Sequence, residues 1–400
     1  MKALYLLIVL LALSSTLLFS DEKLDSYISK NKKEQFRYDQ DKNEAESSKL
    51  RDSWIAPLNL NYSFSKSNPF GDQQTNENAS IKMDQPIFQS GGIYFGIKFA
   101  EASKIYADYS IDVAKRKLVK DAISLLMQIK QIDLKIAKQN LLIKNSEISL
   151  AQKKEDYLSG QLDSGFLDSA IVERNILIQS LYDLETNKER LISRFNAISD
   201  MNYKEALVPN LKLISESQFL EQNIVLGMSE SEIVKNRYFN DVILAKYLPK
   251  VNFTAGYNWD KSDTVYQFGS NEKDYYNFGF KVNLPIDINS FRDVESSKID
   301  YLKAKLVVED RKRELKAIFE QVMQNIENFE KKKQLSVENR DIYEKLLEDT
   351  KELFSAGYKA EFDVELLQNS VNIQKGDVEI YEIDKQLELL TLYEMYKDEI

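Results

Sequence analysis

Two long stretches of the chain carry the apolar spacing of a coiled coil. The first, from Gly91 to Glu155, contains no proline, and its apolar residues recur at alternating steps of four and three. These residues are Leu118, Ala122, Leu125, Ile129, Ile132 and Ile136. A repeat of about 3.5 residues predicts helices that wind left-handed around a partner. At about 1.5 Å per residue, a helix over this span extends on the order of 100 Å, more than a compact domain needs.

The same spacing returns in the second half of the chain, again without proline. The second seam consists of Leu315, Phe319, Val322, Ile326 and Phe329. The segments in front of the two stretches also correspond, with Gln85-Pro86-Ile87-Phe88 matching Leu284-Pro285-Ile286-Asp287. A repeat of this length predicts an internally duplicated architecture.

A strand hairpin is expected before each helical stretch, at about 57–86 and 249–285, because apolar and polar residues there alternate strictly. Loops are expected near 67–77 and 262–274. Such alternation fits a soluble sheet with one face in water, and it also fits an outer-membrane barrel with a wet lumen. Two hairpins cannot close either structure, so we expect oligomerisation to supply further strands.

Glycines mark the points where each long helix ends and the chain turns back. Gly160 predicts one helical hairpin over 91–195, and Gly357 predicts a second over 289–396. Residues 21–53 are expected to form a surface helix. The connection between the halves, 199–248, is expected to contain a short strand at 208–213 and a helix from 217 to 247 that is interrupted at Gly227.

Composition restricts the chemistry that the chain can perform. The 400 residues include no histidine and no cysteine, and the formal net charge is −10. The commonest general base, the thiol nucleophile and the usual zinc, copper and haem ligands are therefore missing. The acidic balance argues against nucleic acid as a partner. Carboxylate pairs such as Asp241 with Glu230 lack a supporting nucleophile, so an enzyme is the least favoured class and no cofactor is expected.

The N-terminus reads as a signal peptide over residues 1–20. Lys2 precedes an apolar run from Leu4 to Phe19, and Ser20-Asp21-Glu22 follows it. A retained membrane anchor is the alternative, although the run is at the short limit for crossing a bilayer.

The order of these elements resembles the TolC-like outer membrane efflux proteins, which are exit ducts of drug pumps and type I secretion systems. The paired strand-to-helix turns, the strand-opening Pro57 and Pro249, and the tips at Gly160 and Gly357 carry the resemblance over nearly the whole mature chain. It divides the chain into repeats at 21–198 and 249–400, joined by an equatorial connection at 199–248.

The resemblance implies a mixed α/β membrane protein that assembles as a homotrimer. Four strands from each of three protomers would form one twelve-stranded β-barrel in the outer membrane, continued through the periplasm by a long α-helical coiled-coil barrel. Implied partners are outer-membrane lipid, a periplasmic adaptor and an inner-membrane transporter that supplies the energy. The alternative is a coiled-coil structural or adaptor protein of the cell envelope without channel activity, which would have no use for the strand hairpins.

The resemblance also assigns roles to the two tips. Ser159, Gly160, Ala356 and Gly357 are the candidates for contact with the adaptor. Asp363 stands six residues after Gly357 and matches the family's constriction aspartate, with Glu361 and Glu365 beside it. Leu366 replaces a second family aspartate, and at the first tip Asp168 lies eight residues after Gly160. Without the resemblance, Asp363 reads as a cap for the helix that follows.

Overall fold

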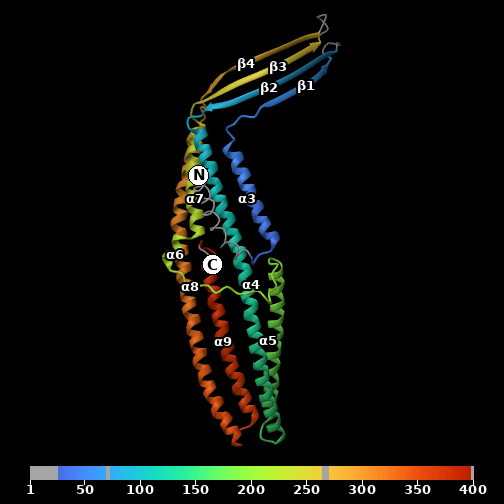
Figure 1. The fold of residues 1–400 in the computed structure, drawn as a ribbon, viewed down its shortest axis with the longest axis vertical. Coiled ribbons are helices and arrows are strands. Elements are labelled where there is room, and N and C mark those ends of the chain that lie inside the picture. Colours follow the sequence, from blue (N-terminus) through green and yellow to red (C-terminus); the bar gives the residue numbers. More distant parts are fainter. Residues whose placement is uncertain (1–25, 69–72, 264–269, 398–400) are drawn as a thin grey trace, which may run out of the picture. The chain divides into compact units, whose positions relative to one another are not determined.

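The computed structural model describes residues 26–68, 73–263 and 270–397, so the expected signal peptide at 1–20 lies outside the described residues. The order of strand, strand, long helix and shorter helix occurs twice in the chain (Figure 1). The elements are α3 (Lys30–Arg51), β1 (Asn59–Ser67), β2 (Gln74–Phe88), α4 (Gly92–Leu158), α5 (Ser164–Asn196), α6 (Glu216–Glu221), α7 (Ile224–Lys246), β3 (Lys250–Asp263), β4 (Ser270–Asn283), α8 (Ser290–Ser355) and α9 (Glu361–Tyr393).

Contacts group the described residues into two compact units. The first, here the helical unit, comprises described residues up to 37 together with 112–224 and 312–397. The second, the sheet unit, comprises described residues of 38–111 and 225–311. The predicted surface helix is confirmed as α3, which contributes residues to both units.

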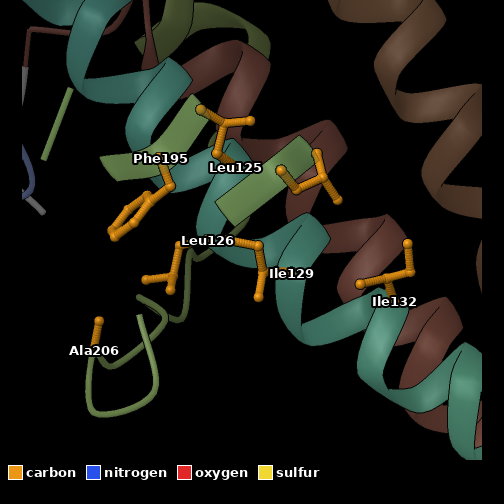
Figure 2. Packing of buried hydrophobic residues seen from close by; sticks show 7 residues of the cluster. Leu125, Leu126, Ile129, Ile132, Phe195 and Ala206 are labelled. Atoms are coloured by element: carbon orange, nitrogen blue, oxygen red, sulfur yellow. The ribbon is translucent and has the colours of Figure 1, made fainter. Parts of the chain in front are cut away.

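The core of the helical unit lies along α4, where the predicted seam is confirmed. Ala122, Leu125, Ile129 and Ile132 are buried. The neighbouring Ile123 and Leu126 are buried as well, so α4 is covered on more than one side. Figure 2 shows Leu126 and Ile129 beside Phe195 of α5 and Ala206 of the following loop. Burying side chains of this size from water contributes about 1.5–3 kcal/mol each.

Four helices of the helical unit lie side by side in the order α5, α4, α9, α8 (Figure 1). Ion pairs join each neighbouring pair of helices in that order. They are Arg174 with Glu147 at 3.3 Å, Lys138 with Asp377 at 2.6 Å, and Lys333 with Glu382 at 2.5 Å. The two predicted helical hairpins, α4–α5 and α8–α9, are therefore joined through α4 and α9.

The sheet unit contains one antiparallel sheet in the order β1-β2-β3-β4, which confirms both predicted strand hairpins. The strands extend further than expected, because residues 74–77 and 270–274 belong to β2 and β4 and not to loops. Asn76, for example, pairs with Ser65 on one side and Ser262 on the other. Polar side chains do not prevent backbone pairing between strands, so polarity alone does not indicate a loop. Residues 69–72 and 264–269 of the expected loops lie outside the described residues.

The connection between the halves differs from the prediction. Residues 208–213 form no strand, because Leu211 bonds a side chain and not another strand: its N–H donates to Gln386 Oε1 at 2.7 Å, and its carbonyl accepts from Nε2 at 3.4 Å. The helix is interrupted at Gln222 and Asn223, where the Lys397 N–H donates to the Gln222 carbonyl at 2.8 Å.

Gly227 lies inside α7 and does not interrupt it, contrary to the prediction. A Cβ at this position would lie 3.0 Å from Cε1 of Tyr109. The missing side chain therefore lets the Tyr109 ring approach the helix backbone.

Candidate functional site

The turn between α4 and α5, here the first tip (residues 159–163), is a helix end closed by glycine. Gly160 has φ +77°, in the left-handed region that residues with a side chain rarely adopt. Its N–H donates to the Tyr157 carbonyl at 3.0 Å, and the Gln161 N–H donates to the Asp156 carbonyl at 2.8 Å. This is the Schellman pattern, which satisfies carbonyls left open at the helix end.

The turn between α8 and α9, the second tip (residues 356–360), repeats this geometry. Gly357 has φ +80°, its N–H donates to the Phe354 carbonyl at 3.0 Å, and the Tyr358 N–H donates to the Leu353 carbonyl at 2.8 Å. The helices that leave the two tips, α5 and α9, are both 33 residues long. The predicted tip glycines therefore occupy equivalent positions in two matching hairpins.

Both tips also expose apolar side chains beyond the predicted contact residues. Ser159, Gly160, Ala356 and Gly357, the predicted contact residues, are all exposed. Leu158 and Phe166 at the first tip, and Tyr358 at the second, are larger and exposed too. These exposed apolar side chains add to the candidate contact surface at each tip. In the sequence these apolar residues lie outside the alternating four-and-three spacing of the buried seam, and this is the signal that could have identified them as exposed.

Asp363 lies in the first turn of α9, three residues after the N-cap position Ala360. Its Oδ2 accepts a hydrogen bond from the Ala360 N–H at 3.2 Å and lies 3.9 Å from Lys359 Nζ. Because alanine has no side-chain acceptor, only this half of a capping box is present. Within one chain, the Asp363 carboxylate therefore caps the start of α9, as the simpler interpretation predicted.

The three predicted constriction carboxylates share one helix end. Glu361 and Glu365 are exposed and one turn apart on α9, with the half-buried Asp363 between them in sequence. Negative charge is favourable here because a helix N-terminus carries a partial positive charge. Asp168 lies eight residues after Gly160, as Glu365 does after Gly357, so the first tip has one carboxylate at the matching position. Whether these groups line a pore stays a prediction at the level of one chain.

The sheet provides the second candidate surface. One face, the apolar face, carries Leu60, Tyr62, Ile81, Tyr257, Tyr276 and Phe278 in register. The other, the polar face, carries Asn61, Ser80, Asn258 and Asn277. Leu60 is 71% exposed and Phe278 is 72% exposed, whereas Ser80 and Asn258 are only 5% and 6% exposed. Ser80 and Asn258 lie on the central strands, and the polar-face residues Asn61 and Asn277 on the edge strands are exposed. The sheet therefore leaves its apolar face uncovered, whereas a soluble sheet packs that face against a core.

Aromatic side chains end the apolar face on the side of the strand loops. Tyr257 donates to Asp274 at 3.1 Å, and Trp259 Nε1 donates to Glu272 at 2.7 Å. Tyr62 similarly donates to a carboxylate of β2, at 3.2 Å. Amphipathic rings of this kind, with an apolar body and a polar end, suit a boundary between an apolar medium and water.

Two further findings concern the described residues only. No helix among them is long and apolar enough to cross a membrane. No group of metal-ligating side chains among them could hold a metal ion.

Comparisons with known proteins connect these surfaces to a family. Residues 217–395 match the model of the outer membrane efflux protein family. A search of the curated proteins found no match. Among solved structures, the chain is similar to the Campylobacter jejuni CmeC outer membrane channel, with a TM-score of 0.72 and 12% identity over 95% of this chain and 87% of that one.

Two other solved structures have the same fold. The outer membrane protein VceC of Vibrio cholerae gives a TM-score of 0.70 at 12% identity, covering 91% of this chain and 93% of that chain. The open state of the Neisseria gonorrhoeae MtrE outer membrane channel gives 0.62 at 12% identity, covering 90% and 84%. Residues 217–395 therefore form an outer membrane efflux protein domain, and the chain as a whole takes the fold of outer membrane channels.

Proposed function

We propose that the chain is the outer-membrane exit duct of a tripartite efflux pump or type I secretion system, which passively conducts drugs or secreted proteins across the periplasm and the outer membrane. The observation that carries this proposal is the exposed apolar face of the sheet, which runs over all four strands opposite a polar face. A stable surface of this kind needs an apolar surrounding such as lipid on one side and a wet lumen on the other.

The length of the apolar face fits a bilayer. On β3 it runs from Val251 to Trp259, nine residues. A tilted strand needs about 9–11 residues to cross the apolar core of a bilayer, and this stretch reaches that range. The exposed rings at one end then lie where the bilayer meets the outer solvent.

The chain works as a homotrimer. Its four strands leave β1 and β4 at the open edges of the sheet, and four tilted strands are too few to enclose a lumen. Three copies supply twelve strands, so that β4 of one copy pairs with β1 of the next. The helical array has matching edges, since α5 and α8 both expose apolar side chains, such as Ile176 on α5 and Ile342 on α8.

The helical unit extends the duct through the periplasm in this proposal. Its two tips dock a periplasmic adaptor through Ser159, Gly160, Ala356 and Gly357, and the exposed Tyr358 and Leu158 enlarge that surface. An inner-membrane transporter supplies the energy, so the duct itself performs no chemistry and needs no cofactor. Repeats at 21–198 and 249–400 account for the paired hairpins.

Asp363, with Glu361 and Glu365, forms the constriction of the closed duct. Three copies of each carboxylate around a narrow opening concentrate negative potential and attract cations, as charged rings do in channels. The cap that Asp363 makes within one chain is compatible with this role, because a carboxylate has further acceptor sites.

The test is reconstitution of the purified mature protein in planar bilayers, with single-channel current recorded with and without a divalent cation. We expect small, cation-selective currents that the divalent cation blocks. Asp363→Ala is expected to raise the conductance and weaken the block, and Gly376→Ala in the middle of α9 is the control. Unchanged conductance and block would remove Asp363 from the constriction. A folded protein that forms no channels would instead favour the coiled-coil scaffold.

A further inference from the structure

The polar face of the sheet is basic, although the whole chain is acidic. By register, the charged residues on this face of the described strands are Lys82, Asp84, Lys250, Asp260, Lys273 and Lys281. Four lysines and two aspartates give a net charge of about +2 at neutral pH, because lysine and aspartate side chains are ordinarily charged there. The formal net charge of the chain is −10. The polar face of the sheet is therefore positively charged, although the chain as a whole is negatively charged.

Both aspartates on this face are held by neutral amides. Asp84 accepts a hydrogen bond from Asn252 Nδ2 at 2.7 Å, and Asp260 accepts one from Asn78. Within the part of the sheet that the structure describes, none of the four lysines forms an ion pair. The positive charges of these lysines therefore attract anions from the solution in front of the polar face.

A glycine gives one of these lysines room along the sheet surface. Gly256 lies opposite Lys82 on the neighbouring strand. A Cβ at Gly256 would lie 3.6 Å from Lys82 Cγ and 2.7 Å from Asn277 Oδ1. The side chains of Lys82 and Asn277 therefore reach across the place that a larger residue would fill. Elsewhere this face carries mainly Asn, Ser and Thr, which add hydrogen-bonding groups without charge.

We infer that the polar face of the sheet is an anion-attracting segment of the duct, suited to multivalent anions such as solutes with several phosphate or carboxylate groups. This inference rests on the proposed function, in which the polar face lines the lumen. Three copies bring about six net positive charges around one water-filled space inside a protein wall of low dielectric constant, a geometry that focuses the field. The chain then carries a basic face on its sheet and acidic side chains beside the second tip.

The experiment measures block of single-channel current by inorganic triphosphate added on the side of the strand loops. The test variant combines Lys82→Gln with Lys281→Gln. A matched control combines Lys66→Gln with Lys261→Gln, because these two lysines lie on the apolar face of the same sheet. We expect triphosphate to block the unmodified channel, and the half-blocking concentration to rise on the order of ten-fold in the test variant, as loss of lining charge predicts. Lys82→Arg with Lys281→Arg is expected to keep the block.

Two results would overturn the inference. One is an unmodified channel that triphosphate does not block, and the other is equal block of the test variant and the control. If no variant forms channels, the proposed function fails, and calorimetric binding of triphosphate to the detergent-solubilised protein still decides the inference. Binding that is lost with Lys82→Gln and Lys281→Gln but kept in the control supports a basic face, and an unmodified protein that does not bind triphosphate contradicts it.

Discussion

Removal of the Asp377 carboxylate is expected to destabilise the junction between the two helical hairpins. α4 and α9 meet through polar pairs that lie seven residues apart along α4. These pairs are Gln131 with Asp384 at 2.5 Å, Lys138 with Asp377 at 2.6 Å, and Asn145 with Asn369 at 2.8 Å. Each satisfied pair is lost if the helices slip, so the series favours one register.

The size of the effect follows from the surroundings of the central pair. Lys138 Nζ donates to both carboxylate oxygens of Asp377, at 2.6 and 2.9 Å, and Asp377 is 9% exposed. Breaking a fully buried ion pair costs about 3–5 kcal/mol, because one charge stays buried without its partner. The Lys138 side chain is 32% exposed, so water reaches the ammonium and reduces the cost. We therefore expect Asp377→Ala to lower the free energy of unfolding by about 2 kcal/mol.

The assay is a double-mutant cycle by urea unfolding of the detergent-solubilised protein, with Lys138→Ala, Asp377→Ala and the pair together. The expected coupling energy is about 1.5 kcal/mol. The control cycle uses Arg174 and Glu147, which join α4 to α5 at 3.3 Å with side chains 35% and 50% exposed, and its coupling should stay below about 0.5 kcal/mol. A coupling for Lys138 and Asp377 no larger than in the control would refute this account of the junction.

Two other predictions concern α9 and the second tip. Gly357→Ala is expected to destabilise the protein by about 1 kcal/mol, because alanine is strained at φ +80°, while Gly376→Ala inside α9 should stabilise it by a similar amount; urea unfolding of both variants compares them. The hydrogen bond from Lys333 lowers the pKa of Glu382 below its ordinary value of 4.5. The ion pair of Lys333 with Glu382 therefore stabilises the protein fully above pH 4.5, and this stabilisation is lost as pH falls through the pKa of Glu382 in the folded protein. The stability difference between the unmodified protein and Lys333→Met should therefore shrink between about pH 6 and pH 3, and a difference that does not change with pH would contradict it.

The helical hairpins were predictable because their signals are local and repeated. An apolar residue at every third or fourth position defines a buried stripe wherever the partner helix lies, and Leu315 and Ile326 are buried as this rule requires. Gly160 and Gly357 could be selected because few other residues adopt a positive φ at a helix end. Information of this kind needs no knowledge of tertiary contacts.

The polar contacts between elements distant in sequence were not predictable. Asn145 and Asn369 are 224 positions apart, and no periodic pattern links them. The Gln386 side chain bonds the Leu211 backbone where a neighbouring strand would otherwise pair with it. The residues around Gln386 indicate only a helix surface. The ends of β2 and β4 were missed for a related reason, since backbone pairing in a ladder depends on the partner strand and not on the polarity of the residues concerned.

The two interpretations of the strands differ in what meets the apolar face, which a soluble sheet packs against a core and a barrel exposes to lipid. Alternation places Leu60 and Asn61 on opposite faces in either case. In the structure the apolar face is uncovered, since Phe278 is 72% exposed, and this favours the barrel interpretation. The same separation of faces explains how an acidic chain can carry a basic lining. Net charge describes the whole sequence, whereas a solute in front of the polar face meets only the charges on that face, where lysines outnumber aspartates.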